Sequence, residues 1–147
     1  MLSIKFYIPD EEDVHEYSLG HMDISIGDQL LSSSGKSQRL MMVFISFVDL
    51  SNGIVGVVSD KARKNHEFIG TGSSFRLLIN RNDDEISIKN AEQQITLSAT
   101  IGEVAKALSQ CWQDIEKLAI NLDRESSAYL HMVSGKESFQ KAFADIL

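Results

Sequence analysis

The segment Gly35-Lys36-Ser37 has the residue types that close a phosphate-binding loop, in which successive backbone N–H groups wrap the phosphates of a nucleotide. Such a loop also needs a glycine five positions before Gly35, and position 30 is leucine. The segment Gly70-Thr71-Gly72 is a weaker match. We therefore interpret the first segment as a polar connection and the second as a turn before a strand.

Histidine, cysteine and carboxylate side chains are common metal ligands, but their spacing here does not form a ligand set. The histidines are His15, His21, His66 and His131. No two of them lie four residues apart, and none is at ligand spacing from the single cysteine. The run Asp10–Asp13 lacks the glycine and the final glutamate of a calcium loop. His21 could pair with Asp23, but we interpret the histidines as exposed residues of loops and strands, and we predict no metal and no cofactor.

Cys111 could act as a nucleophile if a base and an activating environment lay beside it. It falls on the apolar stripe of a predicted helix, which indicates a buried and unreactive thiol. The sequence contains no nucleophile–base spacing, so we expect that the protein is not an enzyme. A single cysteine also excludes an intrachain disulfide, which fits a reducing cytoplasm.

Charge is segregated along the chain, whose formal net charge is −7. The first 35 residues hold seven carboxylates and one cationic side chain, Lys5, whereas residues 36–81 are net cationic and residues 82–147 are net acidic. A field of one sign steers charged partners, so the acidic third favours a basic protein. The alternative is a solvated surface that only maintains solubility. The negative net charge argues against nucleic acid as a partner, and so does the lack of aromatic residues among the basic side chains of 61–66.

The candidate partner-binding face combines clustered carboxylates with nearby aromatic residues. Ion pairs at the rim of an interface contribute little affinity, so a docking face also needs apolar anchors. Tyr7 and Tyr17 flank the acidic segment and are the first candidates. The carboxylates predicted to bind the partner are Asp10, Glu11, Glu12, Asp13, Glu16 and Asp23.

At 147 residues, with 43% hydrophobic and 24% charged residues, the chain has the size and composition of a single soluble domain, residues 1–147. Its first residues lack the features of a signal peptide. Residues 40–58 are apolar and long enough to span a membrane, but Asp49 near their middle would cost about 2.5–3.5 kcal/mol. We therefore predict a buried helix there, no membrane partner, a cytoplasmic location, and a monomer in preference to an oligomer.

Alternation of apolar and polar residues predicts strands at 2–8 and 22–26, joined into a hairpin by the acidic segment. Three further strands are predicted at 75–80, 85–89 and 94–98, and their short connections indicate an antiparallel meander. After a polar linker at 32–37, Gln38 is expected to open a helix that runs to about Leu50. Residues 54–59 fit either a continuation of this helix or a short buried strand.

The clearest predicted helix follows the last strand. Thr100 and Glu103 match a capping box, in which each side chain accepts a hydrogen bond from the other residue's backbone N–H. The apolar stripe consists of Ile101, Val104, Leu108, Cys111, Ile115, Leu118 and Leu122, widened by Ala105, Trp112 and Ala119. A stripe of this width favours a helix packed on a sheet over a coiled coil. Residues 123–134 are not assigned, and a last short helix is predicted after Gly135.

Together these elements predict one α+β domain, with a mainly antiparallel sheet of about five strands and two or three helices packed on it. In general style they resemble the small bacterial immunity proteins of contact-dependent growth inhibition systems. The resemblance rests on the segments MLSIKFYIPDEED, QRLMMVFISFVDL, FRLLINRNDDEISIK and TIGEVAKALSQCW. It implies a non-enzymatic inhibitor that binds a cognate toxin domain, in many cases a basic nuclease, and it carries over no residue roles.

Two other functions are open at this point. A secretion chaperone for a protein client would also be small, acidic and α+β, although such chaperones usually begin with a helix and this chain begins with a predicted strand. A small enzyme that uses paired carboxylates would need two acidic side chains facing each other across a cleft, about 5–10 Å apart.

Overall fold

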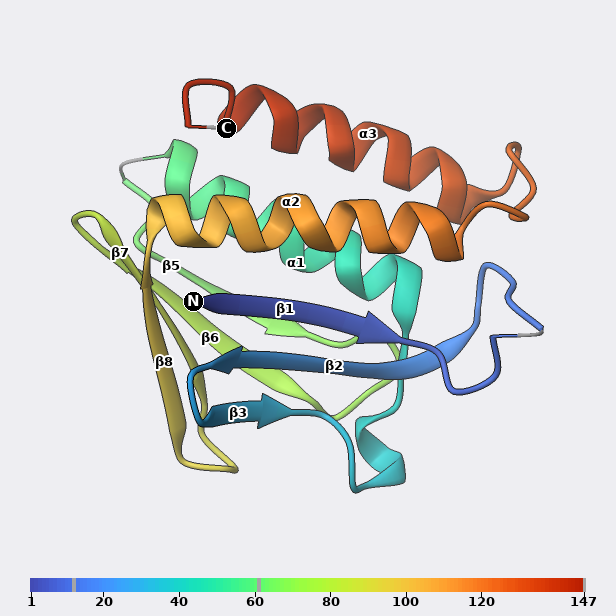
Figure 1. Ribbon diagram of the computed structural model, residues 1–147, viewed down its shortest axis with the longest axis horizontal. Helices are drawn as coiled ribbons and strands as arrows, with labels where there is room; N and C mark the ends of the chain where they lie inside the picture. The colour runs from blue at the N-terminus through green and yellow to red at the C-terminus, as the bar shows by residue number, and fades with distance from the viewer. Residues whose placement is uncertain (12, 61, 147) are drawn as a thin grey trace.

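The computed structural model describes residues 1–11, 13–60 and 62–146 (Figure 1). Over these residues the chain forms two antiparallel sheets and three α-helices, which confirms the predicted α+β class. The prediction of about five strands was approximate, because three short strands add to it and the strands divide between two sheets. In Figure 1 the helices occupy the upper half of the view and the strands the lower half.

The first sheet contains β1 (Leu2–Tyr7), β2 (Leu19–Ile26), β3 (Gln29–Ser32) and β4 (Met41–Met42). β1 and β2 form the predicted antiparallel hairpin, with Lys5 opposite Asp23 and Tyr7 opposite His21. Gly27 adopts a positive φ of 56° in the tight turn that leads into β3. β3 was not predicted, because it has only four residues and only Leu31 of its side chains is fully buried.

The second sheet is a meander of β5 (Asn65–Ile69), β6 (Arg76–Asn82), β7 (Glu85–Asn90) and β8 (Ile95–Thr100), in that order. The last three strands match the predicted meander. β5 was missed because it begins within the basic segment of residues 61–66, and Phe68 is its only fully buried residue.

Helix α1 (Val43–Ser59) begins five residues later than predicted, after a short 3₁₀ turn at Ser37–Arg39 and strand β4. Of the two alternatives for residues 54–59, the continuation of the helix is the observed one. Most of its surface is buried, as predicted for this apolar segment. Among the residues that the structure describes, no helix combines the length and the hydropathy needed to cross a membrane.

Helix α2 (Ile101–Leu118) has the predicted capping box: the Glu103 N–H donates to Thr100 Oγ1 at 3.1 Å, and the Thr100 N–H donates to Glu103 Oε1 at 3.2 Å. Helix α3 (Ser127–Ala142) begins within the unassigned segment. Gly135 lies inside this helix rather than before it. A Cβ at Gly135 would lie only 2.8 Å from Val48 Cγ1 of α1. The absence of a side chain therefore lets α3 lie directly on α1.

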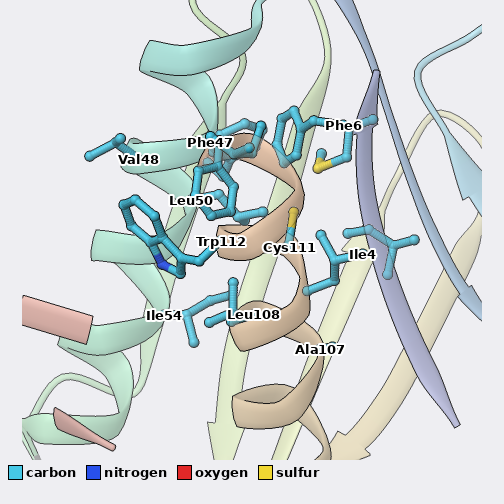
Figure 2. Packing of buried hydrophobic residues seen from close by; sticks show 14 of the residues in the cluster. Ile4, Phe6, Phe47, Val48, Leu50, Ile54, Ala107, Leu108, Cys111 and Trp112 are labelled. Carbon is cyan, nitrogen blue, oxygen red and sulfur yellow. The ribbon is translucent and has the colours of Figure 1, made fainter. Parts of the chain in front are cut away.

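The buried side chains of both sheets and all three helices form one cluster, part of which appears in Figure 2. Trp112 of α2 lies against Phe47 of α1 with ring centroids 4.6 Å apart, and its Nε1–H donates to Ser51 Oγ at 3.1 Å. Leu108 and Ile115 are fully buried, as the apolar stripe predicted. The inner face of α2 is therefore core.

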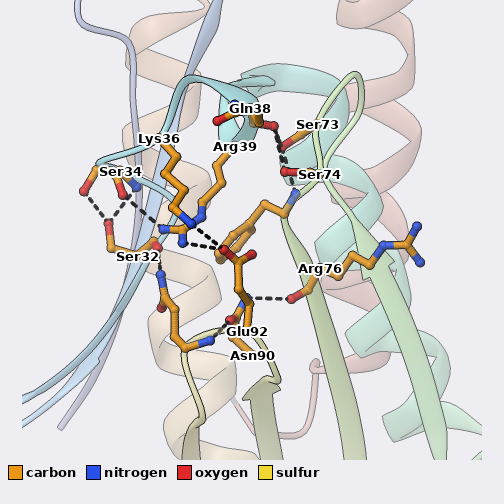
Figure 3. Close-up of polar contacts among 12 residues, drawn as sticks. Ser32, Ser34, Lys36, Gln38, Arg39, Ser73, Ser74, Arg76, Asn90 and Glu92 are labelled. Atoms are coloured by element: carbon orange, nitrogen blue, oxygen red, sulfur yellow. Dashed lines mark hydrogen bonds and ion pairs between the residues drawn. The ribbon is translucent and has the colours of Figure 1, made fainter.

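A polar cluster joins the first sheet to the turn between β7 and β8 (Figure 3). Gln93 Nε2 donates to the Ser32 carbonyl at 2.7 Å, while Arg39 Nη2 and Lys36 Nζ lie 2.9 and 3.0 Å from Glu92 Oε1. The hydrogen bonds from Arg39 and Lys36 lower the pKa of the Glu92 carboxyl. Lys36, the lysine of the phosphate-loop-like segment, thus takes part in a structural ion pair.

Candidate docking surface

The acidic connection between β1 and β2 is fixed at its base. The His15 N–H donates to Ser18 Oγ at 2.8 Å, and the Ser18 N–H returns a bond to the His15 carbonyl at 3.0 Å. The Ser18 carbonyl accepts from the Val43 N–H, which ties the connection to the start of α1. Ile8 and Ser18 are buried. The carboxylates between these anchored ends therefore stand on a fixed base.

A groove lies between this acidic connection, β1 and the end of α2, and we call it the loop groove. Its volume is about 630 Å³. The lining includes the carboxylates Glu11, Asp13 and Asp114, the ammonium groups of Lys5 and Lys117, and the apolar side chains of Val14, Leu118 and Ile120. It therefore offers carboxylates to a cationic group and apolar surface to a side chain beside it.

A second hollow of about 390 Å³ lies on the other side of the acidic connection. It is lined by Asp10, Asp13 and Tyr17 together with the exposed Leu19. Asp13 lines both hollows, so the acidic connection forms a ridge between them. We call Asp10, Glu11 and Asp13 the acidic ridge.

The structure brings most of the predicted docking residues to this ridge. Tyr7 lines the loop groove, half-buried with its ring 5.9 Å from that of His21, and Tyr17 lines the second hollow with 53% of its surface exposed. Glu16 is half-buried and lines neither hollow. Glu12 lies outside the described residues.

Asp23 is separate from the acidic ridge. It lies within β2, directly opposite Lys5 of β1, and accepts a hydrogen bond from Ser32 Oγ at 2.5 Å. This carboxylate is therefore engaged on the sheet, and the structure does not place it with the other predicted docking residues. The neighbouring His21 pairs with Ser33 Oγ at 3.0 Å rather than forming the considered pair with Asp23.

Asp114 and Ile120 are among the residues of the loop groove that were not predicted from the sequence. Asp114 comes from α2, about a hundred positions from the acidic ridge, and only the packing of α2 beside β1 brings it there. Ile120 follows the end of α2 and is 75% exposed. A sequence signal for Ile120 existed, because this apolar residue lies out of phase with the stripe that ends at Leu118 and Leu122.

The thiol of Cys111 is fully buried, as predicted. Burial raises its pKa to about 12, and the nearby Asp114 adds to this effect. The thiol is therefore protonated and poorly nucleophilic at neutral pH.

The basic segment around residues 62–66 packs on α1. His66 lies over Gly53 and its Nδ1 is 2.6 Å from Arg63 Nη2. Burial and then the Arg63 charge lower the pKa of the His66 imidazole, while Asp49 and Glu67 act in the opposite direction. Within the described ranges, no group of three histidine, cysteine or carboxylate side chains is placed to hold a metal ion.

Comparisons with known protein families, with curated proteins and with solved structures give no match for this chain.

Proposed function

We propose that this protein is a non-enzymatic inhibitor, an immunity protein that binds a cationic toxin domain through the acidic ridge. The observation that carries the proposal is the ridge itself: three carboxylates on a connection with fixed ends, between two hollows that each contain an exposed apolar side chain. The resemblance in style to the immunity proteins of contact-dependent growth inhibition supports the same function.

Electrostatic complementarity supports a nuclease as the toxin. A nuclease must hold phosphates, so its active-site cleft is cationic. Carboxylates that enter such a cleft occupy the places of the phosphates and thereby block the substrate. A cluster of like charges also speeds encounter with a partner of opposite charge, and salt weakens this effect because the screening length is about 8 Å at physiological ionic strength.

Affinity needs more than charge, because exposed ion pairs contribute about 0–1 kcal/mol each. Ile120 and Tyr17 are the most exposed apolar residues in the two hollows, with 75% and 53% of their surfaces exposed, and Leu19 beside Tyr17 is also exposed. Large apolar or aromatic side chains of this kind act as anchors when a partner covers them. We therefore propose Ile120 and Tyr17 as the anchors of the interface, with Tyr7 in a supporting position in the loop groove.

The test is an association experiment with a cationic toxin domain, to be sought first among the proteins encoded next to this chain. A variant with Asp10, Glu11 and Asp13 replaced by Lys should associate at least tenfold more slowly, because the steering field is reversed. The matched control replaces Asp28, Asp84 and Glu85 by Lys. These are three exposed carboxylates outside the ridge, two in other turns and Glu85 at the start of β7, so the control has the same net charge.

The control should associate at a rate within about twofold of the parent, since its reversed charges lie outside the ridge. Equal slowing of both variants would show that net charge alone matters, and the ridge would then not be the docking site. The contrary result is a partner that binds only in its own unfolded state and binds the charge-reversed variant as readily as the parent. That result would contradict the proposal and identify this protein as a chaperone.

A further inference from the structure

Strand β5 forms one edge of the second sheet. It pairs with β6 on one side, and in the described part of the chain no strand pairs with it on the other. A free edge presents backbone N–H and C=O groups that can accept another strand, so proteins usually cover or blunt it. β5 contains no proline and only one charged residue, Glu67. Whether this edge can accept a strand depends on which residues carry the outward groups and on what lies beside them.

Hydrogen bonds at the two ends of β5 show which of its residues bond to β6. The Gly70 N–H donates to the Phe75 carbonyl at 3.0 Å, and the Arg81 N–H donates to the Lys64 carbonyl at 2.7 Å. Both pairs continue the register of β5 and β6. Hydrogen-bonded and non-hydrogen-bonded pairs alternate along an antiparallel ladder, so the even-numbered residues of β5 are the ones that bond to β6.

The odd-numbered residues of β5 therefore direct their backbone groups to the free edge. These residues are Asn65, Glu67 and Ile69, and all three are exposed. Each offers one N–H and one C=O to an added strand. The outward backbone groups thus belong to residues at the surface, and an added strand would not have to displace core side chains.

A hollow of about 370 Å³ lies beside this edge, and we call it the β5 hollow. Asp49, Asn52 and Gly53 line it from α1, Arg63 lines it from the turn before β5, and residues 66–69 line it from the strand. Successive side chains of a strand point to opposite faces of the sheet, so both faces of β5 contribute to this lining. Residues from both faces can line one hollow only at the edge of a strand. Helix α1 therefore packs on the inner face of β5 and leaves its edge open.

Each charged side chain that lines the β5 hollow already has a partner in the protein. The pairs and the distances between their nearest atoms are Asp49 with His131 at 3.5 Å, Glu67 with Arg76 at 3.0 Å, and Arg63 with His66 at 2.6 Å. The two carboxylates are thus balanced by the guanidinium groups of Arg63 and Arg76. Lys64 is exposed and does not line the hollow. This charge balance favours an uncharged occupant.

Apolar surface next to the edge indicates which side chains the occupant carries. Ile69 of β5 and Leu78 of β6 lie on the open face of the sheet, with 43% and 41% of their surfaces exposed. The residue of an added strand that lies directly opposite Ile69 would share this face and cover Ile69. β-branched and aromatic side chains are the ones that stabilise such cross-strand pairs.

A second copy of this chain fits the edge less well than a segment of another protein. A symmetric antiparallel pairing that uses all three outward residues would place the Glu67 side chains of the two copies directly opposite each other. Like charges in that position are destabilising. Each copy also carries a net charge of −7, which opposes self-association.

We propose that the free edge of β5 binds an uncharged, extended segment of another protein, which adds to the second sheet as a further strand. Strand addition derives affinity from main-chain hydrogen bonds and specificity from pockets for alternate side chains. Side chains opposite Glu67 and Ile69 would lie on the open face, and the alternate side chains would face the β5 hollow. This site goes beyond the proposed function and does not depend on the acidic ridge.

The probe is a set of peptides of about ten residues, selected from a random display library on the intact protein and then synthesised. We expect the selected peptides to have uncharged central residues with β-branched or aromatic side chains. N-methylation of alternate peptide residues tests for a strand, because only one of the two alternate sets donates its N–H groups to β5. Methylation of that set should weaken binding about tenfold or more, whereas methylation of the other set should change it by less than about threefold.

Two replacements of Glu67 separate its backbone from its side chain. Glu67→Pro removes an N–H that does not bond to β6, so the sheet retains its ladder while peptide binding should fall about tenfold or more. The matched control is Glu67→Thr, which also loses the ion pair with Arg76 but retains the N–H. It should bind within about twofold of the parent, because an exposed ion pair contributes little. Circular dichroism and thermal unfolding show whether both variants are folded.

The parent protein supplies a measurement that needs no variant, since a bound peptide should slow amide exchange at Asn65, Glu67 and Ile69. Failure to select peptides, equal effects of the two methylation patterns, or unchanged exchange at these amides would overturn strand addition. Parent-like binding by a folded Glu67→Pro variant would do the same. A concentration-dependent dimer that slows exchange at these amides without peptide would overturn it by making a second copy the occupant. The acidic ridge is tested separately, with the charge-reversed variant and the toxin domain.

Discussion

Helices α1 and α2 pack against each other through Phe47 and Trp112, but they are specified in different ways. Helix α2 has a complete capping box and a regular apolar stripe, so its start is encoded locally. Helix α1 has no side-chain cap hydrogen bond, contains two glycines, and is buried over most of its surface. Local sequence therefore determines α2, whereas the elements packed around α1 determine where it begins.

The two helices also differ in how much of their surface a partner could reach. The outer face of α2 borders the loop groove, so α2 combines a core face with a candidate docking face. A segment whose structure is set locally can present a partner-binding surface without relying on contacts at that surface. Three predictions test this difference between the helices.

The largest effect is expected for Leu108→Ala on the core face of α2. Leu108 is fully buried, so the change should lower the free energy of unfolding by about 2–5 kcal/mol, from lost transfer energy and the cavity left behind. Chemical denaturation measures this loss. Gln113→Ala on the exposed face is the control and should stay within about 0.5 kcal/mol of the parent. A loss below roughly 0.5 kcal/mol for Leu108→Ala would mean that this stripe is not core.

A smaller effect is expected at the start of α2. Thr100→Ala removes the hydroxyl that accepts the Glu103 N–H, and it should cost about 1 kcal/mol of unfolding free energy. Thr100→Ser retains the hydroxyl and should recover most of the loss. Equal destabilisation by both replacements would show that packing of the threonine methyl, and not the capping bond, fixes the start of α2.

The smallest effect concerns pH and α1. Burial and Arg63 lower the pKa of His66 in the folded protein, so the unfolded chain binds the proton more readily. The stability that neutral His66 contributes is therefore present above its ordinary pKa of about 6.5 and is lost as the pH falls below that value. Unfolding measurements at pH 7.5 and 5.5 should show a smaller difference for His66→Asn than for the parent. An unchanged difference would contradict the assignment to His66.

Most of the fold could be predicted from the sequence where the pattern is local. The β1–β2 hairpin, the meander of β6 to β8 and the capped helix follow from alternation, turn residues and the capping box. The structure also contains β3 and β5, which were not predicted because each is short and buries a single side chain. Gly135 was taken as the boundary of a helix, but it is an interior residue that allows close contact with Val48.

The docking surface was only partly predictable for a related reason. The carboxylates of the acidic ridge are consecutive or nearly so, and a run of charge is visible in any sequence. Asp114 and Ile120 join them through the packing of α2 beside β1, which no local pattern encodes. Asp23 was included because it is close in sequence, yet its place within β2 opposite Lys5 separates it from the ridge.

The most direct test of the central claim, that the acidic ridge docks a cationic toxin domain, is a hydrogen-exchange footprint of the complex. We predict that binding slows amide exchange in the connection between β1 and β2 and around Ile120, while the β6–β7 turn exchanges as in the free protein. Slowed exchange at the β6–β7 turn, with the acidic ridge and Ile120 unchanged, would place the interface elsewhere and contradict the account.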